Sequence, residues 1–410
     1  MANSKTATTG RTVLTLLSII TLSACLGTKL NAQSNFWDSP DAYLGQPRPS
    51  DSPKIFAPGL LADSGTIVMD RIAFSPDGRE IYYCQNDQWL NLEHAKIKCF
   101  KYADHKWNGP TVLNQNFYAP AFSMDGNTLF MSDKFTNRVW QSKRTADGWS
   151  APAIYLQEPY ALYEFMPTNS GACYVGSNPD PIDAKNGGTY VIQFSVLTLS
   201  NGGATVKSLG IPLNEPGFNG DFFIARDESF MVVSTKETKD YESELYISYR
   251  KADKSWTKPK SLGPAINDGL AHRWGQFVTP DNKYLFYTRG TSPKACAIFW
   301  VRFDKLLEDL KHTNFDPYVK TPIADQTAIA GTRFSFKVDD ATFFDDDGND
   351  TLSFTASLAD GGPLPSWMHF DPATKIISGT PLASGTYKIT VTATDTAKAS
   401  ASSSFSVIVK

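Results

Sequence analysis

The stretch that decides the fold is Phe74-Ser75-Pro76-Asp77-Gly78, followed two residues later by Ile81-Tyr82-Tyr83. An apolar residue and a small residue lead through a Pro-Asp-Gly turn into an apolar strand. Pro presets φ near −65°, and Gly accepts a positive φ, so this combination is typical of a tight turn between two antiparallel strands. The stretch therefore predicts a β-hairpin.

The same phrase recurs along the chain. Its further copies keep the apolar start, the turn and the strand that follows, and they begin at Phe122, Phe165, Ile224 and Val278. The starts lie 43 to 59 residues apart. A repeat period of this length is the signature of a propeller or solenoid, in which each repeat is one supersecondary unit.

Each hairpin is followed by a third predicted strand and then by an outer one. The third strands are expected at residues 97–100, 138–142, 190–194, 245–249 and 298–302. The turn before the outer strand recurs as Trp107-Asn108-Gly109-Pro110, Trp149-Ser150-Ala151-Pro152 and Trp256-Thr257-Lys258-Pro259. Each repeat is therefore expected to be a four-stranded antiparallel sheet, and sheets of this kind arranged radially form a propeller.

The fifth repeat lacks an outer strand, because a short helical pattern follows residue 302. An unassigned strand at residues 53–60 resembles the outer strand of the fourth repeat at residues 259–266. We expect it to complete the last blade. The prediction is thus an all-β fold: a five-bladed β-propeller over residues 50–315, with six blades as the alternative, closed by its own N-terminal strand.

These phrases resemble the WD-repeat-like, TolB-type β-propeller family, especially at residues 74–83 and 278–287. The resemblance covers about 270 residues. It implies a propeller fold but no particular activity, because one fold hosts many functions.

The last ninety residues show a different sequence pattern from the repeats. Short strand patterns at residues 333–338, 351–356, 375–378, 387–394 and 402–409 predict an Ig-like β-sandwich over 321–410. The run from Pro363 to Met368, then Ile377-Ser378-Gly379-Thr380-Pro381, resembles the putative-immunoglobulin (cadherin-like) domains of secreted bacterial proteins. Clustered acids at residues 345–347 and Asp395 make Ca²⁺ a possible ligand there, with a solvated acidic turn as the alternative.

The N-terminus has the form of an export signal over residues 1–32. Lys5 and Arg11 precede an apolar run at residues 13–22, which is too short to span a bilayer. Cleavage after Ala32 would give a periplasmic or secreted protein. The alternative is a lipoprotein, because Leu22-Ser23-Ala24-Cys25 fits a lipobox with a lipid anchor at Cys25. No later segment is apolar for about 18 residues, so no transmembrane span is expected.

Charge and cysteine content narrow the function classes. The formal charge is −3, and loss of residues 1–32 removes three cations and no acids, which gives −6. A nucleic-acid partner is not expected, because such proteins carry a basic excess. An oxidising compartment allows disulfides, and Cys84 and Cys99 fall in neighbouring predicted strands. A bridge and two buried thiols are both compatible with this placement.

Candidate site residues gather where the first strands of the blades begin and where the loops between second and third strands emerge. Loops on a rigid scaffold commonly carry function. No metal or cofactor motif is present in the propeller, so none is predicted. Candidate catalytic residues there are His272, Tyr118, Tyr163 and His94, and candidate substrate-binding residues are Arg71, Arg273, Trp274, Lys236, Arg289, Asp221 and Glu164.

The region where these residues gather is the predicted mouth of the propeller. It is rich in basic and aromatic side chains, which favours an anionic oligosaccharide or polysaccharide as partner. The leading hypothesis is β-elimination on a uronate, by a lyase or a dehydratase. Arg273 or Arg71 would neutralise the carboxylate, His272 would take the C5 proton, and Tyr118, Tyr163 or His94 would protonate the leaving oxygen. The architecture is loosely similar to oligosaccharide dehydratases and lyases of ulvan-degrading loci.

Two other hypotheses remain open. In a glycoside hydrolase, Asp70, Glu164 and Asp221 would converge from three blades to supply paired carboxylates. In a non-catalytic protein, the propeller would bind glycan or act as an envelope scaffold. Products distinguish the two enzymes, since elimination creates a new double bond and hydrolysis does not.

Overall fold

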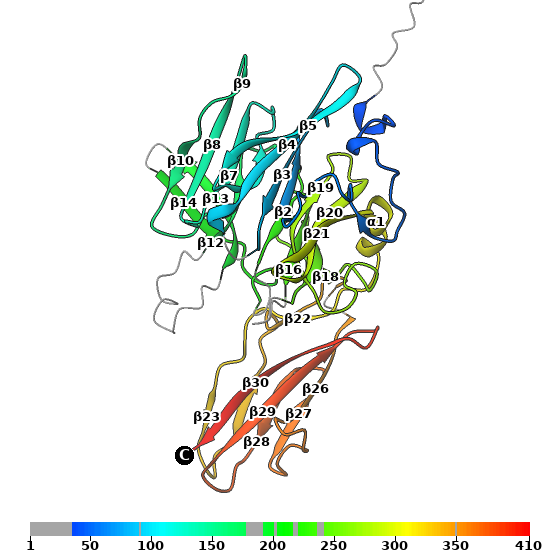
Figure 1. The fold of residues 1–410 in the computed structure, drawn as a ribbon. Helices are drawn as coiled ribbons and strands as arrows, with labels where there is room; N and C mark the ends of the chain where they lie inside the picture. The colour runs from blue at the N-terminus through cyan, green and yellow to red at the C-terminus, as the bar shows by residue number, and fades with distance from the viewer. Residues whose placement is uncertain are drawn as a thin grey trace, which may run out of the picture. The chain divides into compact units, whose positions relative to one another are not determined.

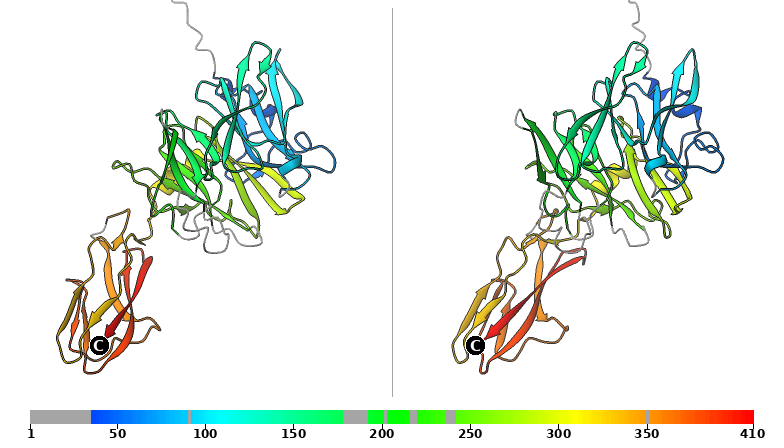
Figure 2. Two further views of the ribbon diagram at one scale, coloured as in Figure 1. Left: turned by 90° about the vertical axis from the view of Figure 1, so that its left-hand side faces the viewer. Right: turned by 60° about the vertical axis from the view of Figure 1, so that its left-hand side comes forward.

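We analysed a computed structural model of the chain. It describes residues 35–89, 92–177, 192–200, 203–215, 220–235, 242–348 and 351–410. The predicted export signal and Cys25 lie outside these ranges. Figure 1 shows the chain coloured from blue to red, and Figure 2 shows two further views.

Within the described residues, the region before the sandwich forms five antiparallel sheets, each with a path of four strands. The first contains β2 (Ile67–Phe74), β3 (Glu80–Asn86), β4 (Lys96–Ala103) and β5 (Lys106–Gln115). The second contains β6 (Tyr118–Phe122), β7 (Thr128–Ser132), β8 (Arg138–Thr145) and β10 (Ala153–Gln157), with β9 (Gly148–Trp149) paired to β8. The third contains β11 (Tyr163–Pro167), β12 (Cys173–Ser177), β13 (Gln193–Ser200) and β14 (Gly203–Ser208).

The fourth sheet contains β15 (Phe222–Ile224), β16 (Phe230–Thr235), β17 (Glu244–Tyr249) and β18 (Lys260–Ser261). The fifth contains β19 (His272–Val278), β20 (Tyr284–Ser292), β21 (Ala295–Arg302) and β1 (Lys54–Ile55). The innermost strands touch one another in the order β2, β6, β11, β15, β19 and back to β2. This closed ring is the arrangement of a propeller.

The recurrent turn explains why these sheets form. In the first copy, the Ser75 hydroxyl donates to Asp77 at 2.6 Å, and Gly78 adopts a φ of 75°. The Ser75 amide donates to the Glu80 carbonyl at 2.9 Å and closes the hairpin. Ser123 with Asp125 and Thr279 with Asp281 repeat the side-chain bond at the same length. Local turn chemistry therefore fixes the register of the two inner strands in each of these copies.

The N-terminal segment closes the ring. Strand β1 pairs antiparallel with β21, with Lys54 opposite Trp300 and Ile55 opposite Phe299. The predicted closure of the last blade by its own N-terminal strand is therefore present. In place of a further strand, α1 (Asp304–Lys311) follows β21.

The propeller core extends further towards the N-terminus than the predicted start at residue 50. Two 3-10 helices, η1 (Phe36–Asp38) and η2 (Tyr43–Gly45), precede β1. Trp37 and Tyr43 are buried, and both rings pack on Phe74. These aromatic side chains belong to the same buried core cluster as the inner hairpin of the first sheet.

The C-terminal region is an Ig-like sandwich with its own core. One sheet contains β23 (Gln326–Ala328), β30 (Ser400–Val409), β29 (Gly385–Thr394) and β26 (Ser353–Leu358), and β23 runs parallel to β30. The other contains β24 (Phe334–Lys337), β28 (Ile376–Gly379) and β27 (Met368–Asp371), and β22 (Tyr318–Val319) pairs with β25 (Phe343–Phe344). Ile377, Ile389 and Val391 are fully buried between the sheets.

Two further predictions concern a disulfide between Cys84 and Cys99 and the absence of a transmembrane span. Cys84 and Cys99 are both buried thiols rather than a disulfide. Cys84 lies opposite Ile97 and Cys99 opposite Tyr82, so the two are diagonal neighbours, about 7–8 Å apart in such a ladder and too distant for a bridge. Among the described residues, no helix has the length and apolarity needed to cross a bilayer.

Candidate active site

A repeated irregularity in the innermost strands builds the site. In four of these strands the pairing shifts directly after one residue: Met69, Tyr118, Tyr163 or Trp274. The next residue in each strand has a positive φ: Asp70 (65°), Ala119 (48°), Glu164 (56°) and Gly275 (61°). A β-bulge re-aims a side chain in this way. Two of the four bulges place a carboxylate residue, Asp70 or Glu164, at a positive φ. For a non-glycine residue this backbone conformation costs about 1–3 kcal/mol.

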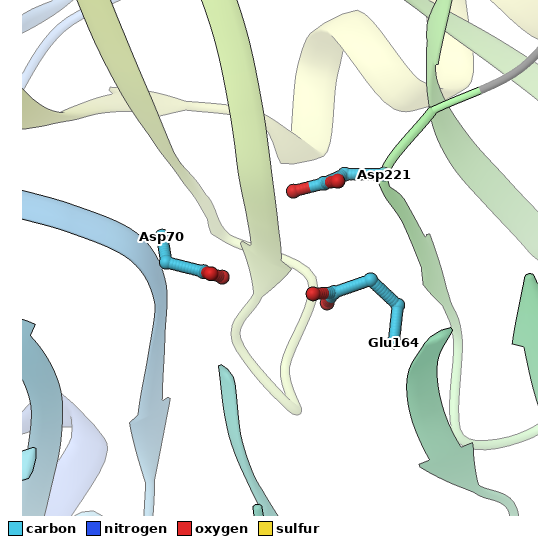
Figure 3. A group of neighbouring side chains, drawn as sticks. All are labelled: Asp70, Glu164 and Asp221. Atoms are coloured by element: carbon cyan, nitrogen blue, oxygen red, sulfur yellow. The ribbon is translucent and has the colours of Figure 1, made fainter. Parts of the chain in front are cut away.

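Three carboxylates meet where these bulges face one another. Figure 3 shows Asp70, Glu164 and Asp221 directed towards a common centre; they come from β2, from β11 and from the residue just before β15. One oxygen of each lies within 4.8 Å of the others. All three are buried, with 3%, 0% and 5% of their surfaces exposed. Three acids at this depth need compensation, because burying an unpaired charge is very costly.

Arg71 supplies part of that compensation. Its Nη1 lies 3.0 Å from Glu164 Oε2, and both side chains are fully buried. Its Nε and Nη2 donate to the carbonyls of Pro120 and Ala119, each at 3.1 Å. Arg71 therefore joins the first three sheets and carries the one guanidinium that offsets the three acids.

Asp221 is held by two donors. Tyr163 Oη donates to Asp221 Oδ1, and the Gly275 amide donates to Oδ2 at 2.9 Å. Asp70 Oδ1 accepts only the Arg71 amide, at 2.5 Å, among the hydrogen bonds of the described residues. The two aspartates thus have different environments although they share one site.

Burial raises the pKa of all three acids. For Asp70, desolvation and the neighbouring Asp221 raise the pKa from 3.8 to about 7. Burial raises the pKa of Glu164 well above its ordinary value, opposed by Arg71. Burial also raises the pKa of Asp221, opposed first by its bond from Tyr163. When two titratable groups lie in different environments, their pKa values differ, and one can act as an acid while the other acts as a base.

A pocket of about 270 Å³ opens onto this cluster. It lies where the innermost strands of the five sheets meet, and we call it the axial pocket, or acidic pocket. Its lining comes from all five sheets and is aromatic, apolar and acidic: Met69, Asp70, Trp89, Leu92, Tyr118, Tyr163, Ile192, Gly220, Asp221, His272 and Trp274. Trp89 stands edge-on to Trp274, with ring centroids 5.4 Å apart. The pocket therefore has two carboxylates at its base and flat ring faces on its wall.

His272 forms part of the aromatic wall. Its ring stacks on Trp274 with centroids 4.2 Å apart, and Nδ1 lies 3.1 Å from the Ser243 hydroxyl. Burial lowers the pKa of His272 from 6.5 to about 4, so the ring is neutral at physiological pH. A neutral imidazole is chemically able to accept a proton.

The structure gathers six of the predicted site residues at this pocket and its cluster. Tyr118, Tyr163, His272, Trp274 and Asp221 line the pocket, and Glu164 lies in the carboxylate cluster. Burial raises the pKa values of the Tyr118 and Tyr163 hydroxyls, so both stay protonated. Trp89 and Leu92 complete the wall from the loop between β3 and β4, and no sequence pattern singled out Leu92.

The predicted basic residues have other roles. Arg273 is 1% exposed, and its guanidinium donates to the backbone carbonyls of Ile266, Ser243 and Ala271. Arg289 pairs with Asp268 at 3.2 Å. Neither lines the pocket, and Lys236 lies outside the described residues. In the described lining, no cation faces the pocket.

His94 does not line the pocket that His272 lines. It lies in the 3-10 helix η3 (Leu92–His94), with 62% of its side chain exposed, and Nδ1 lies 3.0 Å from Asp87 Oδ2. Its neighbours line a separate surface cavity with Glu93 and Lys96. An acid role for His94 at the axial pocket therefore has no support in this geometry.

An alternative role for the three-acid cluster is a cation site. Its spacing would admit one, and it is the one such group among the described residues. Arg71 already pairs with Glu164, and Tyr163 and Gly275 already donate to Asp221. We therefore interpret the cluster as acids that share protons. The Ca²⁺ hypothesis for the sandwich stays a prediction; Asp345 and Asp395 there accept the backbone amides of Asp347 and Ala399.

Comparison with known proteins supports the fold of the C-terminal region. A family model described as "Putative Ig domain" matches residues 316–410, five residues before the predicted boundary. No curated protein matches the sequence significantly.

Solved structures with partial likeness include both propellers and a larger enzyme. They include the Cps50 (Swd1) propeller domain of Myceliophteria thermophila (8% identity, TM-score 0.32, covering 56% of this chain and 65% of that one) and TolB from Acinetobacter baumannii (14%, 0.33, 57% and 54%). A putative α-galactosidase from Bacteroides fragilis matches with 21% identity and a TM-score of 0.19, covering 23% of this chain and 18% of its own. Each is covered over less than two thirds of its length, and at these TM-scores no activity is inferred from them.

Proposed function

We propose that the chain is an exported, carbohydrate-active propeller that binds a neutral sugar in the axial pocket and hydrolyses its glycosidic bond. The observation that carries this proposal is that Asp70 and Asp221 meet at the base of an aromatic pocket. Two carboxylates with different environments are what glycoside hydrolysis needs, and ring faces of Trp and Tyr cover the apolar faces of sugars.

The two aspartates suit different roles. With a pKa of about 7, Asp70 still carries a proton in about half of the molecules at neutral pH and can deliver it to the leaving glycosidic oxygen. Asp221 receives hydrogen bonds from Tyr163 and Gly275, which favour its ionised form. Its carboxylate would attack the anomeric carbon as the bond to the leaving oxygen breaks. Water would then release the sugar, with Asp70 taking the proton.

The spacing of the acids favours retention of configuration. One oxygen of Asp70 lies within 4.8 Å of one oxygen of Asp221. Retaining enzymes hold their two carboxyl groups about 5–5.5 Å apart, whereas inverting enzymes need roughly 6.5–9.5 Å to admit a water molecule. A covalent intermediate on Asp221 follows from this comparison.

β-Elimination on a uronate has less support here. It needs a cation or strong donor on the substrate carboxylate. The guanidinium groups of Arg71 and Arg273 are bound to protein groups, and the base of the pocket is acidic. A uronate would meet charge repulsion there, while a neutral sugar would not.

The test is incubation with 4-nitrophenyl glycosides of neutral sugars, with uronate oligosaccharides as a parallel panel. We expect release of nitrophenolate and reducing sugar without an unsaturated product. Asp70→Asn and Asp221→Ala should each lower turnover by at least about 100-fold, the usual scale of a lost acid or nucleophile. Azide should restore turnover of Asp221→Ala with a glycosyl azide as product.

Asp147→Asn, in the exposed turn between β8 and β9, is the matched control and should match the wild type. Binding of a sugar without turnover would instead identify the pocket as a lectin-like site. An unsaturated product from the uronate panel would overturn the proposal in favour of elimination.

A further inference from the structure

A second cavity lies at the other end of the innermost strands. It has a volume of about 50 Å³ and receives lining from all five sheets, including Phe74, Phe122, Met166, Phe223 and Phe277. Asp70 lines the first pocket and the next residue, Arg71, lines this one. The Arg71–Glu164 pair therefore marks the boundary between an acidic pocket and an apolar one.

One residue breaks the repeat at this end. The turn that closes each inner hairpin begins with an amide-to-carbonyl bond from Ser75, Ser123, Thr168, Ala225 or Thr279. The residue after each of these is, in chain order, Pro76, Met124, Asn169, Arg226 and Pro280. Four turns thus place an uncharged residue at this position, and the fourth sheet alone places a cation there. A site that departs from an otherwise consistent local rule is where function is expected.

Arg226 has no compensating charge. It is half-buried, and among the described residues its side chain makes no hydrogen bond or ion pair. The adjacent Asp227 lines the neighbouring polar cavity, where its Oδ1 accepts from the amide and the hydroxyl of Ser229 at 3.0 and 2.6 Å. Desolvation lowers the pKa of Arg226 without an opposing acid. A guanidinium in this setting lacks the anion that its five donors are shaped to bind.

Arg226 also connects the apolar cavity to a polar one. A neighbouring cavity of about 160 Å³ shares Phe223 and Arg226 with the first and is lined further by Asn169, Asp227, Thr279 and Asn282. The guanidinium therefore lies between a wall of phenylalanine rings and a rim of polar side chains, of which Asp227 is already bound by Ser229. A ligand that fills both cavities needs an apolar body and an anionic end.

We propose that this end of the propeller axis binds a carboxylate carried on a compact apolar body, with Arg226 pairing the carboxylate and Phe223 and Phe277 contacting the body. Charge complementarity and the apolar wall argue for one molecule that carries both features. A planar carboxylate matches the fork geometry of a guanidinium. The site is distinct from the acidic pocket, so it does not depend on the proposed hydrolysis.

The test uses benzoate as the probe and full-length folded protein with ¹³C-methyl methionine. Met124 and Met166 line the apolar cavity, whereas Met69 lines the acidic pocket and Met368 lies in the sandwich. Titration should shift the methyl signals of Met124 and Met166 with saturation and leave those of Met69 and Met368 unchanged. Benzyl alcohol, which has the same ring but no charge, should bind at least about tenfold more weakly, because the charged bond is lost.

Arg226→Met copies the residue that the second sheet has at this position, so it is expected to fold. It should lower benzoate affinity at least about tenfold. The affinity of Arg226→Lys should fall between those of the wild type and Arg226→Met. Equal binding of benzoate and benzyl alcohol to the wild type would overturn the proposal. So would unchanged benzoate affinity in Arg226→Met, or shifts confined to Met69.

Discussion

Arg71 on β2 and Glu164 on β11 form an ion pair of 3.0 Å in which both side chains are fully buried. This contact links the first and third sheets across the centre of the ring. Removing one partner of a buried pair leaves the other charge uncompensated, which costs much more than the pair contributes. The pair is therefore expected to control both the stability of the ring and the charge of the acidic pocket.

Arg71→Met should lower the free energy of unfolding by about 3–5 kcal/mol, since Glu164 would lose its only cation among the described residues. Urea denaturation followed by tryptophan fluorescence measures the change. Glu164→Gln in the Arg71→Met background should recover part of the loss. If the double variant is as unstable as the sum of the two single variants, the pair does not act as a unit.

A second prediction concerns Gly275, which lies against the backbone of Asp70. A Cβ at Gly275 would come within 2.3 Å of the Asp70 carbonyl carbon, and the residue has a φ of 61°. Gly275→Ala should therefore lose more than about 4 kcal/mol of stability, in the range reached only by severe packing or backbone conflicts. Gly263 also has a positive φ, of 85°, but open space around it. Gly263→Ala should cost only about 1 kcal/mol, the conformational share alone, and equal losses at the two sites would refute the close approach.

Much of this fold could be predicted because its determinants are local. The Ser-Pro-Asp-Gly turn at residues 75–78 bonds within itself, so six residues suffice to place β2 and β3. The closing strand β1 followed from comparing repeats. The segment at residues 36–49 was missed, because Phe36, Trp37 and Tyr43 are fixed by packing on distant strands rather than by a local pattern.

The site was harder to predict because of the bulges. An inserted residue changes the face on which each following side chain lies. Arg71 and Arg273 each follow directly on a pocket-lining residue, and sequence alone could not show that their guanidinium groups turn to backbone carbonyls. The convergence of Asp70, Glu164 and Asp221 could be proposed from the repeats, whereas the choice between a basic and an acidic pocket depends on where the bulges direct each side chain.

A third prediction follows from the pKa of Asp70, which is raised from 3.8 to about 7. Between these two pH values the folded chain holds a proton at Asp70 that the unfolded chain has released. The unfolded state binds fewer protons, so stability falls as pH rises from 3.8 to about 7 and changes no further above it. The difference in unfolding free energy between wild type and Asp70→Asn, measured across pH 4–9, should show this trend. A difference that is flat with pH would contradict the raised pKa.

The last prediction separates hydrolysis from elimination through His272. Because burial lowers the pKa of His272 to about 4, its ring should stay neutral from pH 5.5 upwards, which ¹⁵N chemical shifts of the imidazole can measure. His272→Phe keeps a ring to stack on Trp274 but removes the contact of Nδ1 with Ser243. Under the proposed hydrolysis, His272 is part of the wall, and this variant should retain turnover within about tenfold, a small loss beside that of a catalytic group. Abolished turnover in a folded His272→Phe protein, with Asp221→Ala still active, would instead assign proton abstraction to the imidazole and restore the elimination hypothesis.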